Sequence, residues 1–341
     1  MAPPCRRRLE RGRLVSAALE RRLTWRNPFS APRLPVVSRL HLRSYAPSAR
    51  LRQELPKIAL RPFFRLAYRL GLGGSGELAL RSGSRERRAA FRGRNLQFSA
   101  LYLPQHAGGY ESETWALLDA LVGPQAVFYD IGANWGYFSL GLAARAAFRG
   151  RIHAFEPLPE TFADLEGLVA ALELGGRIQA HRLALSDREG EGRAAIPDGL
   201  HSGITRVSAG GAGSPVALAS VDGLGLEPPS VMKIDVEGGE AAVLCGAAKA
   251  LDGARPFVVF ESWSGPQGGS AALKPFEMLE KRGYEFFHPG WAAAPEEGRE
   301  AALRLVAFAP EQRGLLREQL NVLAAPKSRR AELEALFPPL R

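Results

Sequence analysis

The chain has 341 residues, and its 46% apolar and 23% charged content is that of a folded globular protein, which excludes general disorder, collagen and coiled coil. Two cysteines, Cys5 and Cys245, are too few for a disulfide-stabilised secreted scaffold, and no cluster has the spacing of a structural zinc site. The formal net charge of +10 is uneven, because residues 1–97 carry 23 basic and 5 acidic side chains, whereas the rest of the chain carries 22 and 30.

Residues 1–97 read as an arginine-rich extension with scattered prolines. Residues 14–23 and 58–72 have helical periodicity, and the second stretch mixes apolar residues with arginines, as in a basic amphipathic helix. The glycine-rich run 71–76 predicts a linker. The extension fits a solvated, partly disordered arm, a sequence upstream of the true start, a transit segment, or a patch that contacts an anionic surface. Since the rest of the chain is acidic, the positive net charge of the whole chain does not indicate nucleic-acid binding.

From residue 98 onward, predicted strands alternate with predicted helices. The expected order is a helix N-capped by Ser112, strand 126–131, helix 137–148, strand 151–155, helix 160–172, strand 178–185, short strands 193–196 and 204–207, strand 231–234, helix 240–251, strand 256–260, helix 271–281, and strands 284–287 and 303–308. This alternation predicts an α/β fold with a doubly wound, mostly parallel, seven-stranded sheet. The last two strands, joined without a helix, predict an antiparallel hairpin at one edge. The expected divisions are the extension 1–97, the α/β domain 98–325 and a tail 326–341.

The first strand of this domain leads into the turn at residues 130–136, Asp-Ile-Gly-Ala-Asn-Trp-Gly. In an open α/β sheet, ligands bind outside the carboxyl ends of the strands, where the strand order reverses. A dinucleotide fingerprint would place a third glycine at position 137, but that residue is Tyr137. A bare pyrophosphate cradle is therefore disfavoured.

Carboxylates follow three successive strands, and together they suit S-adenosylmethionine. Asp130 would attract the ammonium of the methionine part, and Glu156 stands where an acid accepts both hydroxyls of a ribose. Asp187, after the third strand, would meet an adenine edge. The candidate cofactor-binding residues are Asp130, Gly132, Ala133, Asn134, Gly136, Glu156, Ser186, Asp187 and Asp235.

Five motifs resemble those of the FkbM-type S-adenosylmethionine-dependent methyltransferases. They are residues 127–140, 154–157, 183–187, 220–224 and 232–240, and Lys-Ile-Asp-Val-Glu-Gly at 233–238 is the most specific of them. The resemblance runs from about residue 109 to 308 and leaves residues 1–97 outside. It implies the seven-strand class I methyltransferase sheet and methylation of a hydroxyl, often on a sugar or a natural product.

Methyl transfer to a hydroxyl is an in-line displacement, and a general base contributes about 10²–10⁴-fold to such a step. Asp235 and Glu237 follow the fourth major strand, Glu261 follows the fifth, and His201 lies in a loop that could fold over the pocket. Asp235 is the favoured catalytic residue because its strand end faces the reactive end of the cofactor, and His201, Glu237 and Glu261 are the other candidates. These acids could hold Mg²⁺ as hard oxygen ligands, but without a supporting histidine we expect no metal.

The leading hypothesis is an O-methyltransferase that acts on a small molecule or a glycan in the cytoplasm. One alternative of the same fold is N-methylation of a peptide or another polymer, although no Asn/Asp-Pro-Pro-Tyr motif follows the fourth strand. Another is a protein that docks on a membrane or nucleic acid through its basic extension and has an inactive cofactor pocket. The intact glycines and acids of the motifs argue against such a degenerate pocket.

Overall fold

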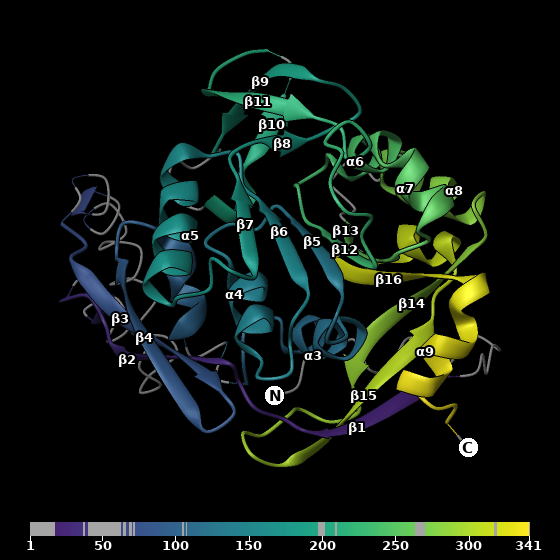
Figure 1. The fold of residues 1–341 in the computed structure, drawn as a ribbon, viewed down its shortest axis with the longest axis horizontal. Coiled ribbons are helices and arrows are strands. Elements are labelled where there is room, and N and C mark those ends of the chain that lie inside the picture. Colours follow the sequence, from purple (N-terminus) through teal and green to yellow (C-terminus); the bar gives the residue numbers. More distant parts are fainter. Residues whose placement is uncertain are drawn as a thin grey trace.

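The computed structural model describes residues 18–36, 38–39, 63, 66–67, 70, 72–103, 106, 108–196, 202–208, 210–262, 270–316 and 319–340. Its main element is a nine-stranded sheet in the order β1-β15-β14-β16-β13-β12-β5-β6-β7 (Figure 1). The strands are β1 (Leu19–Thr24), β5 (Val127–Ile131), β6 (Arg151–Phe155), β7 (Ile178–His181), β12 (Val231–Ile234), β13 (Phe257–Ser262), β14 (Tyr284–Trp291), β15 (Glu300–Ala307) and β16 (Leu320–Pro326).

Five of these strands form the parallel core of the sheet, in the order β13-β12-β5-β6-β7. Every residue of β12 and β13 is buried, as expected for apolar runs that are covered on both faces. The chain builds outward from β5 to β6 and β7, then returns to the other side of β5 to lay down β12 and β13. The strand order therefore reverses between β5 and β12, where an open α/β sheet binds its ligand.

Helices cover both faces of the parallel core, as a doubly wound sheet requires. The helices α3 (Ser112–Leu121), α4 (Tyr137–Ala144) and α5 (Pro159–Ala171) share one apolar cluster with one face of the sheet. The other face packs against α6 (Glu240–Gly246), α7 (Ala248–Gly253) and α8 (Lys274–Glu280). The predicted helix 240–251 is thus two helices, with Ala247 between them, and Glu111 rather than Ser112 occupies the N-cap of α3.

The antiparallel part of the sheet differs from the prediction in size and position. β14 and β15 do pair antiparallel, as their direct connection predicts. However, β16 inserts between β13 and β14, and β1 pairs with the outer side of β15. The hairpin therefore does not form the edge of the sheet, and the sheet has nine strands instead of seven.

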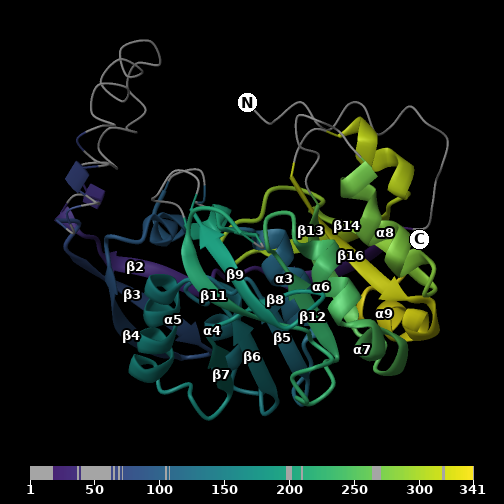
Figure 2. The same ribbon diagram turned by 90° about the horizontal axis from the view of Figure 1, so that it is seen from above.

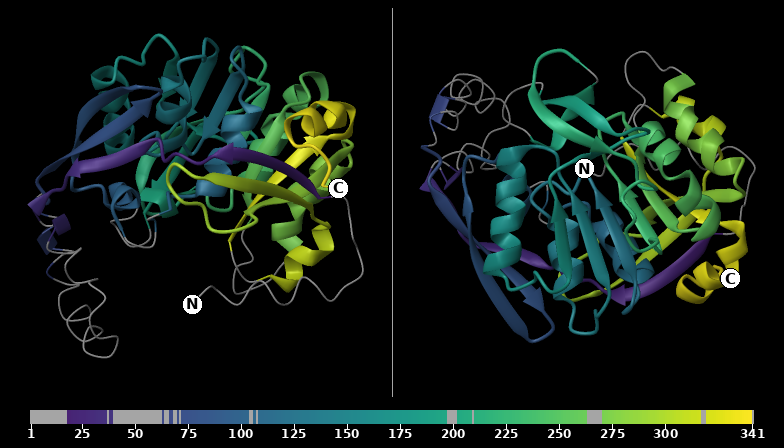
Figure 3. Two further views of the ribbon diagram at one scale, coloured as in Figure 1. Left: turned by 90° about the horizontal axis from the view of Figure 1, so that it is seen from below. Right: turned by 45° about the horizontal axis from the view of Figure 1, so that its top comes forward.

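The boundary at residue 97 is wrong for the part of the extension that the structure describes. Residues 19–23 of the predicted helix 14–23 belong instead to β1 of the main sheet. A second sheet, made of β2 (Phe29–Arg33), β3 (Ser75–Ser82) and β4 (Arg85–Arg92), lies against α4 and α5 (Figures 2 and 3). The end of the predicted linker 71–76 belongs to β3. Most of the predicted helix 58–72 lies outside the described residues.

The C-terminal residues are also part of the fold and not a tail. After β16 ends at Pro326, the helix α9 (Arg330–Leu336) packs against that strand. Leu333 and Phe337 are fully buried in the same cluster as α3 and α4, so this segment contributes to the core.

A small four-stranded sheet stands above the ends of β5, β6 and β7 (Figure 1). Its strands are β8 (Ala184–Leu185), β9 (Gly190–Ala195), β10 (Arg206–Ser208) and β11 (Ser214–Ala219). The predicted strand 178–185 is therefore divided, because residues 184–185 leave the main sheet to pair with β11. Among the described residues, no helix is long and apolar enough to cross a membrane.

The first prediction concerns the N-terminal segment. Trp25 is 1% exposed and lies edge-on to Trp291, with ring centroids 5.4 Å apart. Trp25→Ala should lower the free energy of unfolding by about 3–5 kcal/mol, because it leaves a cavity in the core. Val306→Ala, on the exposed side of β15, should cost less than about 1 kcal/mol. Equal urea midpoints for the two variants would show that the segment does not pack on the core.

Candidate functional site

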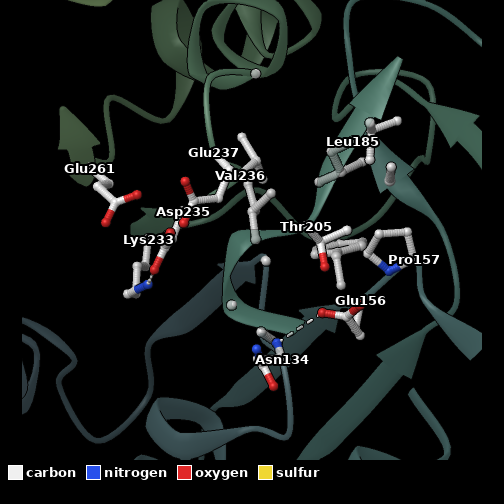
Figure 4. A pocket seen from close by; sticks show the side chains of 18 of the residues that line it. Asn134, Glu156, Pro157, Leu185, Thr205, Lys233, Asp235, Val236, Glu237 and Glu261 are labelled. Carbon is white, nitrogen blue, oxygen red and sulfur yellow. Dashed lines mark hydrogen bonds and ion pairs between the residues drawn. The ribbon is translucent and has the colours of Figure 1, made fainter. Parts of the chain in front are cut away.

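A cavity of about 450 Å³ opens at the carboxyl ends of β5, β6, β12 and β13, where the strand order reverses. The small sheet of β8–β11 supplies its upper wall. Figure 4 shows two groups of side chains in it: Glu156 and Pro157 lie near Thr205 and Leu185, whereas Lys233, Asp235, Glu237 and Glu261 gather at the other end. We call these the Glu156 end and the acidic end of the cavity.

The turn after β5 forms the floor of the cavity, and its backbone conformation depends on glycine. Gly132 has φ +83° and Gly136 has φ +92°, both in the region that side chains disfavour. A Cβ on Gly132 would overlap the carbonyl oxygen of Asp235, and one on Gly136 would press on Leu165. Gly132 therefore allows the turns after β5 and β12 to touch.

The amides of this turn are already used within the protein. Gly132 and Ala133 both donate to the carbonyl oxygen of Phe155, at 3.0 and 2.9 Å, and Gly136 donates to Ala133. Asn134 donates its backbone N–H to Glu156 at 3.1 Å. The turn thus offers a ligand its shape more than hydrogen-bond donors.

Glu156 is buried beside this turn and is held by two backbone amides. Its Oε1 accepts from Leu158 at 2.9 Å, and its Oε2 accepts from Asn134 at 3.1 Å. Burial raises the pKa of this carboxyl to about 7, although the two amide donors oppose the rise. A carboxylate has about four acceptor sites, so two hydroxyl donors could still bind from the cavity.

Ser186 and Asp187 line the cavity beyond Leu185, at the Glu156 end. Asp187 is exposed and accepts a hydrogen bond from the Ser186 hydroxyl at 3.1 Å. The buried side chain of Leu185 gives this end an apolar surface, on which a flat ring could lie.

Asp130 does not line the cavity, in contrast to the prediction. It is a residue of β5 itself, whereas Glu156 and Asp235 follow their strands. Its carboxylate is buried and accepts from the hydroxyl and the backbone N–H of Ser139, at 2.6 and 3.2 Å. Its role here is to fix α4 against β5.

The acidic end of the cavity is organised around one buried lysine. Lys233 is 2% exposed, and its Nζ lies 2.7 Å from Oδ2 of Asp235. Burial opposes its charge, yet Asp235, Glu111 and Asp130 together hold its pKa above the usual value. The sequence predicts that Lys233, in the most specific motif, anchors a carboxylate, and its ion pair with Asp235 agrees with this.

Glu237 and Glu261 complete the acidic end. Burial, followed by the charge of Asp235, raises the pKa of Glu237 to about 7. The same causes, together with the charge of Glu237, raise the pKa of Glu261 to about 10. Glu240 fixes the loop that carries Glu237, because its carboxylate accepts from the backbone N–H groups of Val236 and Gly238.

The structure thus brings together most of the predicted site residues. Around one cavity lie Gly132, Ala133, Asn134, Gly136 through its turn, Glu156, Ser186, Asp187, Asp235, Glu237 and Glu261. His201 lies outside the described residues. Three further residues that the sequence did not indicate line the wall of the cavity: Tyr110, Glu111 and Gln319. Tyr110 and Glu111 lie at the start of the stretch that resembles the FkbM family and Gln319 lies beyond its end, but none of the three belongs to one of the five motifs.

Residues 130–286 match the model of the methyltransferase FkbM domain. This part of the chain is an FkbM methyltransferase domain. The resemblance found in the motifs is therefore confirmed, and S-adenosylmethionine is the cofactor of this family. The comparison with curated proteins found no significant match.

Solved structures of methyltransferases are similar to this chain at low identity. A methyltransferase FkbM from Methylobacillus flagellatus KT is 18% identical, with a TM-score of 0.36, over 54% of this chain and 44% of that one. A precorrin-6y C5,15-methyltransferase from Geobacter metallireducens GS-15 is 14% identical, with a TM-score of 0.38, over 66% and 92%. Aeropyrum pernix fibrillarin, with natively bound S-adenosyl-L-methionine, is 15% identical, with a TM-score of 0.36, over 68% and 90%.

The second prediction separates backbone strain from close contact in the FkbM domain. Gly132→Ala should destabilise the protein by about 3 kcal/mol or more, because the new Cβ overlaps the Asp235 carbonyl as well as resisting a positive φ. Gly83→Ala is the matched control, since Gly83 has φ +61° but open space around it, and it should cost about 1–2 kcal/mol. Urea unfolding measures both, and equal losses would contradict the contact between the two turns.

Proposed function

We propose that this chain is an S-adenosylmethionine-dependent O-methyltransferase whose acceptor is a hydroxyl on a sugar or another small molecule. The observation that carries the proposal is the division of the cavity into the Glu156 end and the acidic end, at the switch point of an FkbM domain. A cytoplasmic location stays a prediction.

The residues present fit the cofactor. The cavity volume of about 450 Å³ lies within the ~300–1,000 Å³ of small-molecule sites. Glu156 would accept the two ribose hydroxyls on its remaining lone pairs, while Ser186 and Asp187 would meet the adenine. The turn at Gly132, Ala133 and Asn134 would lie under the methionine part.

S-adenosylmethionine, when bound, supplies an electrophilic methyl group on a sulfonium. The task of this chain is to hold an acceptor oxygen in line and to remove its proton, and alignment alone can contribute about 7–11 kcal/mol. We assign the acidic end to this task, with Asp235 as the principal residue and Glu237, Glu261 and His201 as the other candidates. Asp235 is favoured because its ion pair with Lys233 fixes its position.

The acidic end favours a hydroxyl acceptor over the planar nitrogen of a base or amide. The strand end reads Ile234-Asp235-Val236-Glu237, and its side chains are carboxylates that can accept a hydroxyl proton. Incubation with methyl-labelled S-adenosylmethionine and a panel of sugars, phenols, lipids, peptides and RNA tests the proposal. Label in a base-stable, acid-stable ether on a hydroxyl compound supports it, whereas label only in peptide or RNA nitrogen contradicts it.

The third prediction concerns Glu156. Glu156→Gln should weaken the binding of S-adenosylmethionine by about 1.5–3 kcal/mol, which is the loss of hydrogen bonds to a charged group. In the unchanged protein, ribose hydroxyls bind the ionised carboxylate, so affinity should fall as the pH drops through about 7, the pKa to which burial raises Glu156. Calorimetry from pH 8 to pH 5.5 measures this dependence, and Glu156→Gln should lose the part that belongs to Glu156, whereas any part due to Glu237, whose pKa is also raised to about 7, should remain.

A comparison of ligands controls for damage to the turn in this variant. The unchanged protein should bind adenosine more tightly than 2′,3′-dideoxyadenosine, because only adenosine has the two hydroxyls. Glu156→Gln should bind both with similar affinity. If the preference for adenosine survives in the variant, Glu156 does not hold the ribose.

The fourth prediction separates Asp235 from His201. Asp235→Asn keeps the shape but removes the charge, and it should lower kcat by about 10²-fold or more at saturating cofactor if the carboxylate serves the chemical step. If His201 is the base, His201→Ala should carry that loss, and Asp235→Asn should mainly raise the KM for the cofactor. A normal kcat in Asp235→Asn would overturn our assignment.

A further inference from the structure

Three carboxylates at the acidic end converge on one point. One oxygen each of Asp235, Glu237 and Glu261 lies within 4.8 Å of the other two. Parallel pairing of β12 with β13 causes this, because Ile234 is opposite Phe260, so the residues that follow them stand side by side. Mg²⁺ binds oxygens at about 2.0–2.1 Å and Ca²⁺ at about 2.3–2.6 Å, so two oxygens that share such an ion are at most about 4–5 Å apart, and the spacing here is at the upper end of what one common cation allows.

Glu261 provides a second, independent observation. Its side chain is buried, with the residue 3% exposed, and its Oε2 has no hydrogen-bond partner among the residues that the structure describes. Figure 4 shows this carboxylate directed toward Asp235 and Glu237. A buried carboxylate oxygen without a partner is costly, so such a group indicates a ligand or a proton that completes it.

The neighbouring lysine does not complete Glu261. Lys233 donates to Asp235 at 2.7 Å, and its side chain also lies over the ring of Phe138, 4.8 Å from the centroid. With all three acids ionised, this group and Lys233 carry a net charge of about −2, which a low-dielectric cavity disfavours. The ionised cluster therefore requires either a proton or a bound cation to offset this charge.

We propose that Asp235, Glu237 and Glu261 bind one hard divalent cation of the Mg²⁺ or Mn²⁺ type at the acidic end of the cavity. An all-carboxylate donor set without histidine or cysteine selects such ions over zinc or copper. This is contrary to the absence of a metal expected from the sequence. The role of the ion rests on the proposed function: its open coordination positions would hold the acceptor hydroxyl in line and favour loss of the hydroxyl proton.

Two competing roles for the three carboxylates have distinct consequences. The carboxylates could stabilise the positive charge of the cofactor's sulfonium, or Glu261 could share a proton with Asp235. In the first case, S-adenosylmethionine should lose affinity in Glu261→Gln while S-adenosylhomocysteine, which lacks the charge, should not. In the second case, no cation should bind at all.

The test is titration of the full chain with MnCl₂ in the absence of any cofactor, followed by calorimetry and by the loss of the free Mn²⁺ electron paramagnetic resonance signal. We expect one saturable site per chain, with affinity at least about tenfold weaker in Glu261→Gln. Glu237→Gln should weaken Mn²⁺ binding to a similar extent. Because Glu237 lies on a loop and not in the sheet, this variant tests the site even if Glu261→Gln does not fold. Mg²⁺ should compete with Mn²⁺ for the site.

Two variants serve as controls for charge alone. Glu111→Gln removes a negative charge from the same cavity, where Glu111 accepts from the Asn321 side chain at 3.0 Å, and Glu166→Gln removes one from the exposed face of α5. Both should retain Mn²⁺ affinity within about threefold, a change of about 0.7 kcal/mol or less. No binding at millimolar Mn²⁺, or equal weakening by Glu111→Gln and Glu261→Gln, would overturn the inference.

The binding measurements also separate this inference from the proposed function. If S-adenosylmethionine binds and Mn²⁺ does not, the cation site is wrong while the cofactor assignment stands. If Mn²⁺ binds as expected and S-adenosylmethionine does not, the proposed function fails while the cation site stands. Once an acceptor is found, removal of the ion by EDTA should abolish methyl transfer without weakening cofactor binding, and Mg²⁺ should restore it.

Discussion

The ion pair between Lys233 and Asp235 is the interaction on which the rest of the site depends. It joins two residues of the same strand end at 2.7 Å, in a place where the lysine is almost completely buried. Isolated charges at such a depth cost several kcal/mol each, so each partner stabilises the charged form of the other. Asp130 stands directly opposite Lys233 on β5, and its negative charge adds to this effect. One lysine therefore allows a central strand to carry an acidic site into the interior.

A backbone contact links the acidic end of the cavity to the turn after β5. The carbonyl of Asp235 lies so close to Gly132 that no side chain fits between them, and the Asp235 amide donates to Ile131 at 2.9 Å. The turns after β5 and β12 therefore form one unit, although they are about a hundred residues apart in the sequence. The rate of a reaction in a site depends on how precisely the reacting groups are placed. A rigid connection between the two turns would hold such groups in a fixed geometry. Gly132 is therefore needed for this contact between the two turns, and not only to let a ligand approach the backbone.

The parallel core could be predicted from the sequence because its signals are local. Apolar runs such as Val231–Ile234 are buried on both faces, and their identity as strands requires no knowledge of the partner. The predicted helix at 14–23 failed because β1 owes its structure to a partner far along the chain, with Leu19 opposite Leu305. Asp130 was misplaced because it belongs to β5 itself and its carboxylate is bound by Ser139 of α4, a contact that its position near the strand end does not reveal.

The two ends of the cavity differ in the same way, and this difference explains why the cofactor could be inferred but the acceptor could not. Glu156 and Asp235 stand at strand ends within the FkbM domain, where position alone indicates their use. The wall beside Glu261 is built from Tyr110, Glu111 and Gln319, which all lie outside residues 130–286. Asn321 ties this wall to the sheet, since it lies in β16 opposite Glu261 of β13 and its side chain donates to Glu111. Similarity within the domain therefore carries information about the cofactor, whereas part of the wall at the acidic end comes from segments outside residues 130–286.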